Sequence, residues 1–209
     1  MKKYKHFTNF DKEEKWLNDM AKQGYRFVAK RSFCYEFAAD APDNAIIKVD
    51  YRTFKKKEDF EEYLFLFEDS GWTHLSGSKS SGYQYFRKAD PRGSDDIFSD
   101  IDSKAGRYKR LADMWETMAL TFIPILTALL VSKAIDPGVL LDPKSIYYTP
   151  GLWDMEGAAF WRAFLFETPF AILRGCLWAI PPLTFALYLI FAYKAHKQFK
   201  LTQENKIIR

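Results

Sequence analysis

Aromatic side chains recur at spacings that could place them around a ligand in the first part of this chain. Aromatic faces attract cations and stack on flat rings, so a cavity lined by them could hold a small aromatic or cationic molecule. The aromatic residues expected to line such a site are Tyr35, Phe37, Tyr83, Tyr85, Trp72 and Tyr25. The alternative is that these rings only pack the core and pair across strands.

Catalytic chemistry is not indicated by any spacing pattern. The sequence contains none of the patterns GxxxxGK[ST], GxGxxG, HExxH, GxSxG or CxxC, which gather phosphate-binding, metal-binding or nucleophilic groups. The histidines are scattered, and His6 and His74 could meet near Asp50 only if their strands pair. We therefore expect no catalytic residue, no metal, no cofactor and no enzymatic activity.

Charge and cysteine content limit the partners and cross-links that we expect for this protein. The net charge of +4 is modest and basic residues are interspersed with acidic ones, so nucleic acid is not an expected partner. The cysteines Cys34 and Cys176 fall in different segments and are expected as buried thiols. The acidic pairs Glu13-Glu14 and Glu61-Glu62 are expected to be solvated charge on helix surfaces.

An internal repeat must position the aromatic side chains. An offset of 47 residues pairs Gly24 with Gly71, and after one inserted residue Tyr35 pairs with Tyr83. Other pairs at the first offset are Tyr4 with Tyr51, Phe7 with Phe54, Trp16 with Tyr63, Leu17 with Leu64, Met20 with Phe67 and Tyr25 with Trp72. This number of matches in one frame indicates two copies of one structural unit.

Each copy reads as strand, helix, strand, strand. Asp11 and Glu14 have the spacing of a capping box that opens a helix in the first copy. Apolar residues from Phe60 to Phe67 form one helical stripe in the second copy, and a glycine then ends each helix. The predicted fold class is α+β: a tandem strand-helix-strand-strand repeat that forms an antiparallel sheet with helices on one face, followed by a two-helix transmembrane region.

This layout resembles, in topology, the effector domains of gyrase-inhibitor-like proteins and multidrug-responsive regulators. In such domains a carboxylate among aromatic residues helps to hold cationic ligands. The resemblance makes Glu36, between Tyr35 and Phe37, the candidate carboxylate of a ligand site here. If Glu36 instead faces solvent from an edge strand, the site has no anionic group.

A boundary is predicted where proline, glycine and serine occur together, so that the first domain covers residues 1–93. Beyond it, apolar residues recur every three or four positions and predict an amphipathic juxtamembrane helix over 94–114, which could run unbroken into the membrane. Its later turns carry the basic residues expected at a membrane surface with anionic lipid, namely Lys104, Arg107, Lys109 and Arg110.

Two apolar segments predict transmembrane helices, at 115–135 and at 169–194. The first contains Pro124, which favours a kink, and the second contains Pro181-Pro182, which favours a bend or local unwinding. Basic residues lie before the first span and in the tail 195–209, so the positive-inside rule predicts a multi-pass protein of the cell membrane with both termini cytoplasmic.

The connection between the spans, 136–168, is expected to be extracytoplasmic. It is mostly acidic among its charged residues and rich in aromatic ones. Aromatic side chains favour the boundary between lipid and water, so the segment 152–168 is expected to lie in the outer interface or, less favourably, to be re-entrant.

Several motifs in order resemble a family of uncharacterised bacterial membrane proteins, the domain of unknown function 2812 family. The motifs are KYKHFTNFDKEEKWLNDMAKQGYRF, VDYRTF, FEDSGW and IFSDIDSKAGRYKR, which lie between roughly residues 2 and 110. The resemblance implies a soluble region followed by hydrophobic helices, and a gene that often neighbours one for a PadR-type transcriptional regulator. It implies no catalytic residue.

We therefore expect a membrane-anchored regulatory or sensory protein. Its cytoplasmic domain would bind a small ligand or a protein partner, and the juxtamembrane helix would relay this to the spans. The alternative is a non-catalytic accessory subunit of a membrane complex, which acts through helix packing in the bilayer with a membrane protein partner or as a homo-oligomer. An enzyme acting on lipid or an envelope component is the third hypothesis. A closed aromatic cavity or an exposed apolar patch would favour the first.

Overall fold

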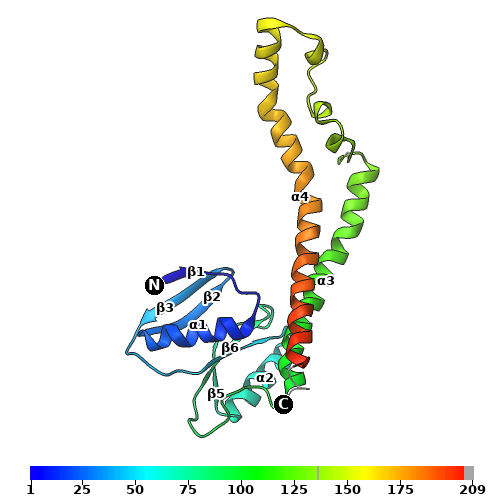
Figure 1. The fold of residues 1–209 in the computed structure, drawn as a ribbon. Helices are drawn as coiled ribbons and strands as arrows, with labels where there is room; N and C mark the ends of the chain where they lie inside the picture. Colours follow the sequence, from blue (N-terminus) through cyan, green and yellow to red (C-terminus); the bar gives the residue numbers. More distant parts are fainter. Residues whose placement is uncertain (136, 205–209) are drawn as a thin grey trace. The chain divides into compact units, whose positions relative to one another are not determined.

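The structure, a computed structural model, describes residues 1–135 and 137–204 of the chain (Figure 1). It forms two compact units: residues 1–114 together with the end of α4 from Phe191, and residues 115–190. The elements of the first unit are β1 (Lys2–Tyr4), α1 (Phe10–Lys22), β2 (Tyr25–Arg31), β3 (Cys34–Ala39), β4 (Ile47–Tyr51), α2 (Lys57–Asp69), β5 (Trp72–Ser76) and β6 (Tyr83–Lys88). Two long helices continue into the second unit, α3 (Ile101–Val131) and α4 (Gly157–Glu204).

The predicted repeat is present, with the predicted order of elements in each copy. α1 begins at Phe10 and α2 begins at Lys57, which is the expected offset, and both helices have 13 residues. Each helix is followed by a glycine in the left-handed region, Gly24 at φ +82° and Gly71 at φ +81°. Glycine adopts this conformation without the steric penalty that a Cβ atom brings, so both helices end in the same way.

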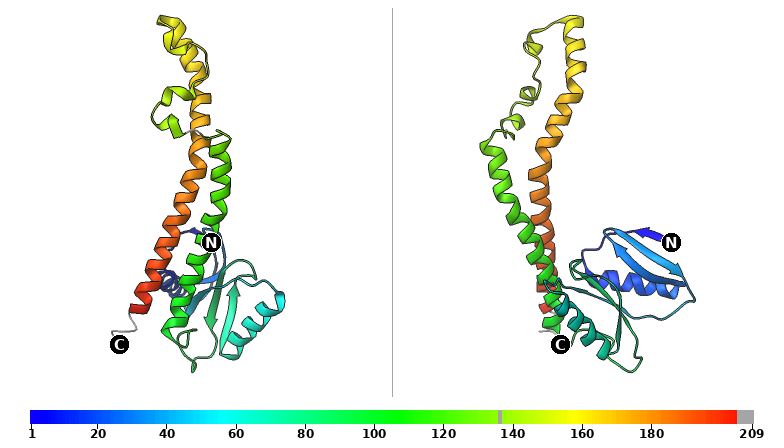
Figure 2. Two further views of the ribbon diagram at one scale, coloured as in Figure 1. Left: turned by 90° about the vertical axis from the view of Figure 1, so that its right-hand side faces the viewer. Right: turned by 180° about the vertical axis from the view of Figure 1, so that it is seen from behind.

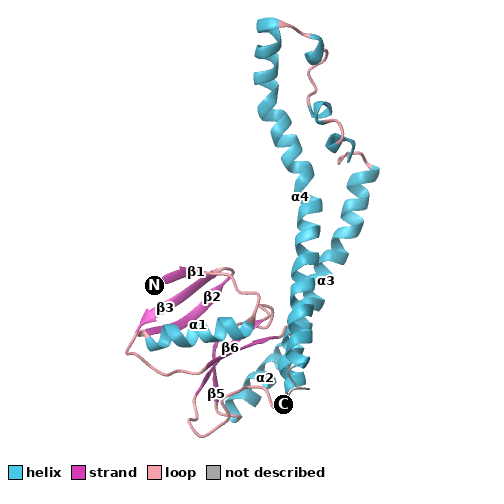
Figure 3. Cartoon of the chain, in the orientation of Figure 1, coloured by secondary structure: helices cyan, strands magenta, loops and turns pink. Residues whose placement is uncertain are grey.

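The strands form two separate antiparallel sheets of three strands, with orders β1-β3-β2 and β4-β6-β5 (Figure 3). The same irregularity recurs in both, between Phe27 and Ala29 in β2 and between His74 and Ser76 in β5. The predicted α+β class is therefore confirmed, and the repeat extends to the local bulge. The strand β3, which carries Glu36, is central in its sheet rather than at an edge.

Each helix buries one face against its own sheet. α1 buries Leu17 and Met20, while α2, coloured cyan in Figure 2, packs Tyr63 against Trp72 and Phe86. α1 also contacts β4 of the other sheet, whereas α2, among the described elements, contacts only its own sheet. The buried acidic residues of the two helices, Glu13 and Glu14, therefore lie on α1, which contacts both sheets.

In the second unit, α3 and α4 are each long and apolar enough to cross a membrane. Both helices run through their prolines, and Tyr188 of α4 packs against Trp115 and Phe122 of α3. α3 begins at Ile101 rather than 94, and α4 begins at Gly157 rather than 169. Most of the segment predicted as interfacial or re-entrant is thus the first turns of α4, preceded by the short 3-10 helices Pro137–Leu140, Pro143–Ile146 and Leu152–Asp154.

An ion pair holds the connection between these helices to α4. The guanidinium group of Arg174 donates to the carboxylate of Glu167 and lies 3.8 Å from the centroid of the Tyr148 ring. The same carboxylate accepts from the backbone N–H of Tyr148 at 3.1 Å and from the hydroxyl of Thr149 at 3.1 Å. These contacts lie within the second unit and fix the residues just before the third 3-10 helix.

Candidate functional site

The start of α1 leaves two carboxylates free for other partners. Asn9 caps the helix, because its side-chain oxygen accepts from the backbone N–H of Lys12 at 3.0 Å. The predicted capping box of Asp11 and Glu14 is therefore wrong. Both carboxylates instead bind an arginine of α3, as described below.

Glu13 of α1 joins the two copies of the repeat. Its Oε1 atom accepts hydrogen bonds from the hydroxyl of Tyr35 in β3 at 2.7 Å and from that of Tyr85 in β6 at 2.6 Å. Burial and the nearby Glu13 carboxylate raise the pKa of both tyrosines, so both hydroxyls remain donors. Glu13 is only 1% exposed, and the prediction that it is solvated surface charge is wrong.

The cation beside this carboxylate is a residue of the chain itself. The ammonium group of Lys30 lies 3.0 Å from Glu13 Oε1 and 3.9 Å from the centroid of the Tyr83 ring. It also lies 5.0 Å from the centroid of the Tyr35 ring. Burial lowers the pKa of Lys30, while the Glu13 carboxylate opposes this shift. The arrangement of rings and carboxylate expected for a cationic ligand is thus occupied by Lys30.

Arg107 of α3 is fully buried and binds α1. Its Nη1 atom donates to Glu14 Oε1 at 2.5 Å and to the backbone oxygen of Val49 at 2.7 Å, and its Nη2 atom donates to Asp11 Oδ1 at 2.8 Å. Burial alone would lower the pKa of Arg107, but the charges of Glu14 and Asp11 outweigh it and raise this pKa. The arginine stays charged, and removing one member of such a buried pair costs about 3–5 kcal/mol.

Arg110, one helical turn further along α3, binds the second copy. Its Nη2 atom donates to Asp50 Oδ1 at 2.6 Å, and its Nε atom donates to the backbone oxygen of Tyr51 at 2.5 Å. The other oxygen of Asp50 accepts from the hydroxyl of Tyr63 in α2 at 2.9 Å. A single turn of α3 therefore contacts acidic side chains of both copies.

These contacts also cover the free edge of β4, which has a partner strand on one side only. The backbone N–H groups of Ile47 and Val49 donate to the side chains of Asn18 and Glu14 in α1. Backbone oxygens on the same strand accept from the two arginines of α3, as described above. An edge strand with unpaired backbone groups invites pairing with other chains, and here helix side chains satisfy these groups. We call this set the α3 docking site; it comprises Asp11, Glu14, Asp50, Arg107 and Arg110.

The α3 docking site can position α3 against the repeat domain, because its charges are paired with each other. The described residues contain no group of three or more side chains that could hold a metal ion. Within the described part of the chain, two buried side-chain atoms lack a hydrogen-bond partner, Oε2 of Glu13 and Nε of Arg107. The end of α4 is attached to the same region, since Asn9 donates to Gln198 at 2.8 Å.

The residues predicted to bind a ligand do not form one site. Tyr35, Tyr83 and Tyr85 converge on Lys30 and Glu13, as described above. Phe37 is buried, with its ring centroid 5.5 Å from that of Trp16. Trp72 belongs to the core beneath α2. Tyr25 is half-buried. The structure brings together only the three tyrosines of the predicted set.

Glu36 lies on the opposite face of β3 from Tyr35 and Phe37, which are both buried. Its side chain is 26% exposed, and its nearest cationic groups are Lys2 at 3.9 Å and Arg31 at 3.8 Å. The proposed role of Glu36 as the carboxylate among the rings therefore fails on position. Glu13, which was assigned to the surface, has that environment.

The basic residues predicted to lie at a membrane surface divide into two groups. Arg107 is 0% exposed, so the prediction is wrong for this residue. Arg110 binds Asp50, and Lys104 donates to Asp96 at 2.8 Å, so both are engaged by the domain. Lys109 is exposed, and its position at a membrane surface remains a prediction.

Sequence reasoning missed the buried acids, although one signal was available. Glu13 and Glu14 lie at i+3 and i+4 from Phe10, and Leu17 follows at i+7, so they occupy the buried stripe of the helix. At the repeat offset Glu13 also corresponds to Phe60, an inward-facing residue of α2. A helical stripe defined by apolar residues alone leaves out the two acids that lie within it.

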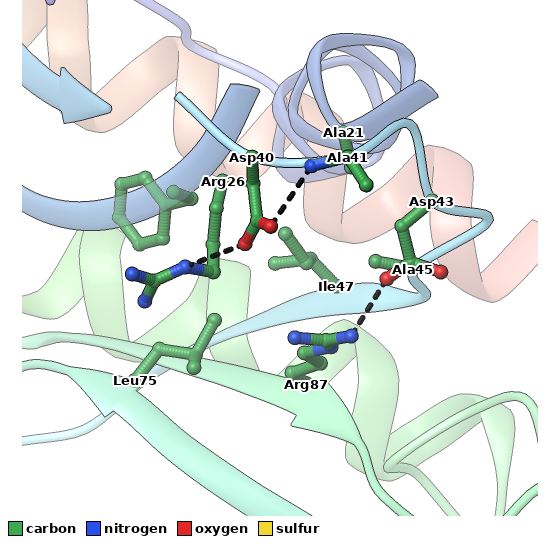
Figure 4. Close-up of a pocket in the computed structure, with 10 residues that line it drawn as sticks. Ala21, Arg26, Asp40, Ala41, Asp43, Ala45, Ile47, Leu75 and Arg87 are labelled. Carbon is green, nitrogen blue, oxygen red and sulfur yellow. Dashed lines mark hydrogen bonds and ion pairs between the residues drawn. The ribbon is translucent and has the colours of Figure 1, made fainter. Parts of the chain in front are cut away.

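The space between the two copies is a small hollow of about 30 Å³, shown in Figure 4. Arg26 donates to Asp40 at 3.0 Å on one side of it, and Arg87 donates to Asp43 at 2.6 Å on the other. Phe27 is the only aromatic residue among those that line it. A volume of this size has room for about one water molecule, so this hollow is not the expected aromatic cavity.

Comparison with known proteins identifies a family. A family model described as "Protein of unknown function (DUF2812)" matches residues 9–120, which is more than half of the chain. No curated protein and no solved structure matches the chain. The matched residues include the repeat from α1 onward, without β1, and the whole α3 docking site. The chain belongs to the DUF2812 family.

Proposed function

We propose that the protein is a membrane-anchored regulatory protein in which the repeat domain controls the base of the first membrane-spanning helix. The observation that carries this proposal is the complete burial of Arg107 on α3, paired with Glu14 and Asp11 of α1. Buried ion pairs add little net stability compared with an apolar core, and their best-attested use is to select one arrangement. A single fixed arrangement suits a helix whose position transmits a regulatory signal.

In this proposal the repeat domain lies in the cytoplasm of a bacterial cell, and both termini are on that side of the membrane. The exposed Lys109 before the first span supports this orientation, as do Lys194, Lys197 and Lys200 after the second. The two long apolar helices anchor the chain in the bilayer. The proposed role requires no reaction at the α3 docking site.

A protein partner is a better candidate for the regulating signal than a small cationic ligand. Lys30 already occupies the position between the tyrosines and Glu13, and the hollow between the copies has room for about one water molecule. A partner that binds the surface of the domain could alter the packing of α1 or β4. Either change would reach Arg107 and Arg110 directly.

Hydrogen exchange tests this proposal on the full-length protein in lipid nanodiscs, with and without soluble extract of the source cells. Regulation predicts that the extract changes exchange at residues 101–114 together with β4, because the two share the buried pairs. The Arg107→Met variant should lose this joint response. Exchange that is unaffected by extract, or that changes at 101–114 independently of β4, would contradict the proposal.

The alternative role is a non-catalytic accessory subunit of a membrane complex. One observation favours it: α3, α4 and the start of the connection between them line an apolar cavity of about 500 Å³, with Leu126, Trp178 and Leu183 among its residues. Apolar surface of this shape could accept a helix of another membrane protein. Hydrogen exchange of the protein in native membranes can be compared with its exchange in nanodiscs. Differences confined to residues 115–190 would support this role.

A further inference from the structure

The second helix of the repeat, α2, presents an apolar pair on its outer face. Phe65 is 70% exposed and Leu66 is 63% exposed. The other apolar side chains of α2 pack inward, with Tyr63 in the core and Phe60 and Phe67 against it. The exposed pair therefore contributes nothing to the core beneath the helix.

Comparison of the two copies shows that the fold does not need apolar residues at these positions. The residues of α1 that correspond to Phe65 and Leu66 at the repeat offset are Asn18 and Asp19. Both are half-buried, and Asn18 accepts a hydrogen bond from Ile47 of β4 at 2.8 Å. α1 is covered there by the second sheet, whereas α2 has apolar side chains at the same positions and no such cover in the described chain.

A groove lies beside the exposed pair. It has a volume of about 640 Å³, and Leu66 lines it together with Phe54 and Tyr63. The acidic residues Asp59 and Glu62 of α2 form one wall. A groove that combines apolar anchors with a charged wall is typical of surfaces that receive an amphipathic helix.

The charge of α2 indicates which kind of helix this is. The helix carries one basic residue, Lys57, which pairs with Glu61 at 3.0 Å. Its exposed acidic residues are Glu58, Asp59, Glu61, Glu62, Glu68 and Asp69. This acidity disfavours docking against a second copy of α2 or against anionic lipid, because like charges would meet. A partner with basic residues gains from the same charges.

We propose that the outer face of α2 binds a basic amphipathic helix of a partner protein, with Phe65 and Leu66 as the apolar anchors. This inference rests on the proposed function, since it names the surface through which the domain would receive its signal. Arg52 and Lys55 also line the groove, outside α2, and they favour a partner that places its own basic residues toward the acidic side chains of α2 rather than toward these two.

The test uses full-length protein in phosphatidylcholine nanodiscs and two fluorescent probe peptides. One peptide is a helix of leucine and lysine with leucines at i, i+3, i+4 and i+7, and the other has glutamate in place of every lysine. Fluorescence anisotropy gives the affinity of each peptide, and empty nanodiscs give the background. The lysine peptide is expected to bind more tightly than the glutamate peptide, and less tightly at high salt.

The decisive variant is Phe65→Asn/Leu66→Asp, which gives α2 the residues that α1 has at the same positions. Because the first copy folds with these residues, the variant should remain folded, and circular dichroism checks this. We expect it to weaken binding of the lysine peptide about tenfold. The variant Glu62→Lys should weaken it as well. Tyr4→Asn, which removes a side chain that is 78% exposed on the other copy, is the matched control and should change nothing.

Equal affinity of wild type and the Asn/Asp variant for the lysine peptide would overturn the proposal, as would tighter binding of the glutamate peptide. The experiment also separates this proposal from the regulatory one. If the lysine peptide binds at α2 but does not alter exchange at residues 101–114, the docking surface stands and regulation through α3 is not supported by it. If extract alters that exchange equally in wild type and in the Asn/Asp variant, regulation stands and the α2 surface is wrong.

Discussion

Arg107 of α3 donates a hydrogen bond to Glu14 of α1 across a sequence separation of 93 residues. The side chains are 0% and 5% exposed, respectively. The pair therefore connects the first helix of the repeat domain to the helix that leads into the first candidate membrane span. Because an isolated buried charge is far less stable than a paired one, neither residue can leave this position without a large cost.

The first prediction concerns this pair. Replacing Arg107 by Met leaves the buried Glu14 carboxylate without its main cation, and we expect the free energy of unfolding to fall by about 3–5 kcal/mol. The measurement is urea unfolding of the full-length protein in detergent, followed by tryptophan fluorescence in a background that keeps only Trp16 and Trp72 of the domain. In this background the other tryptophans are replaced by phenylalanine, at Trp115, Trp153, Trp161 and Trp178. Lys109→Met, an exposed change on the same helix, should stay within about 0.5 kcal/mol of wild type.

A double-mutant cycle makes this prediction specific to the pair. Glu14→Gln should also destabilise, but the double variant Arg107→Met/Glu14→Gln should lose clearly less than the sum of the two single losses. Strict additivity of the two effects would mean that the residues do not stabilise one another, contrary to their geometry.

The repeat was predictable from sequence because its signals are local. The glycine that ends each helix, the apolar stripe of α2 and the aromatic strands are each defined within a few residues, and the offset between Gly24 and Gly71 holds in the structure. The α3 docking site was not predictable in the same way. Its pairs join residues far apart in the chain, and a single sequence contains no direct signal for which Arg meets which acid.

The error over Glu13 and Glu36 has a physical origin. Adjacent residues of a strand point to opposite faces, so Glu36 could not share the environment of Tyr35. The carboxylate among the rings came instead from a helix, at a position where an acidic residue is usually solvated. Burial of Glu13 is made possible by Lys30 and two tyrosine hydroxyls, which only the tertiary fold assembles.

The second prediction concerns the glycines that end the two helices. A Cβ atom at Gly24 would lie 2.9 Å from the backbone oxygen of Asp40, and φ there is +82°. Gly24→Ala therefore adds a backbone clash to the cost of a left-handed conformation, and we expect a loss of about 2–4 kcal/mol in the unfolding assay above.

Gly71→Ala should be destabilising too, because its Cβ atom would lie 2.9 Å from the Cβ atom of Asp90. Gly151→Ala is the matched control. Gly151 also has a positive φ, +66°, but no atom lies within 4 Å of its Cβ position, and it belongs to the second unit. It should leave unfolding of the domain unchanged. If Gly24→Ala were as stable as the wild type, the close contact between position 24 and the backbone of Asp40 would be refuted.

The third prediction concerns orientation in the membrane. In a background of Cys34→Ser and Cys176→Ser, single cysteines are introduced at Lys109 and at Ser145, which are both exposed. A membrane-impermeant maleimide should label Ser145→Cys in intact cells, and Lys109→Cys only after the cells are permeabilised. The reason is that basic residues flanking a span stay on the cytoplasmic side. The reverse labelling pattern would place the domain outside the cell.

The last prediction concerns stability in mild acid. Burial lowers the pKa of His74, although hydrogen bonds to Gln84 and to the backbone at Ser76 oppose the shift. Burial and the nearby Lys30 also lower the pKa of His6. Both histidines therefore bind protons more weakly in the folded chain than in the unfolded chain, whose histidines titrate near pH 6.5. As the pH falls below about 6.5, the unfolded state takes up more protons and the free energy of unfolding must decrease.

The slope of this decrease distinguishes the two histidines from other groups. Each contributes at most about 1.4 kcal/mol per pH unit, and only between its lowered pKa and about 6.5. Unfolding measured from about pH 7.5 down to about pH 5 stays above the range in which most carboxylates titrate. The variant His74→Gln should show a shallower slope than wild type over this range, and the double variant with His6→Gln a shallower slope still. A slope that is unchanged in both variants would assign the acid sensitivity to groups other than these histidines.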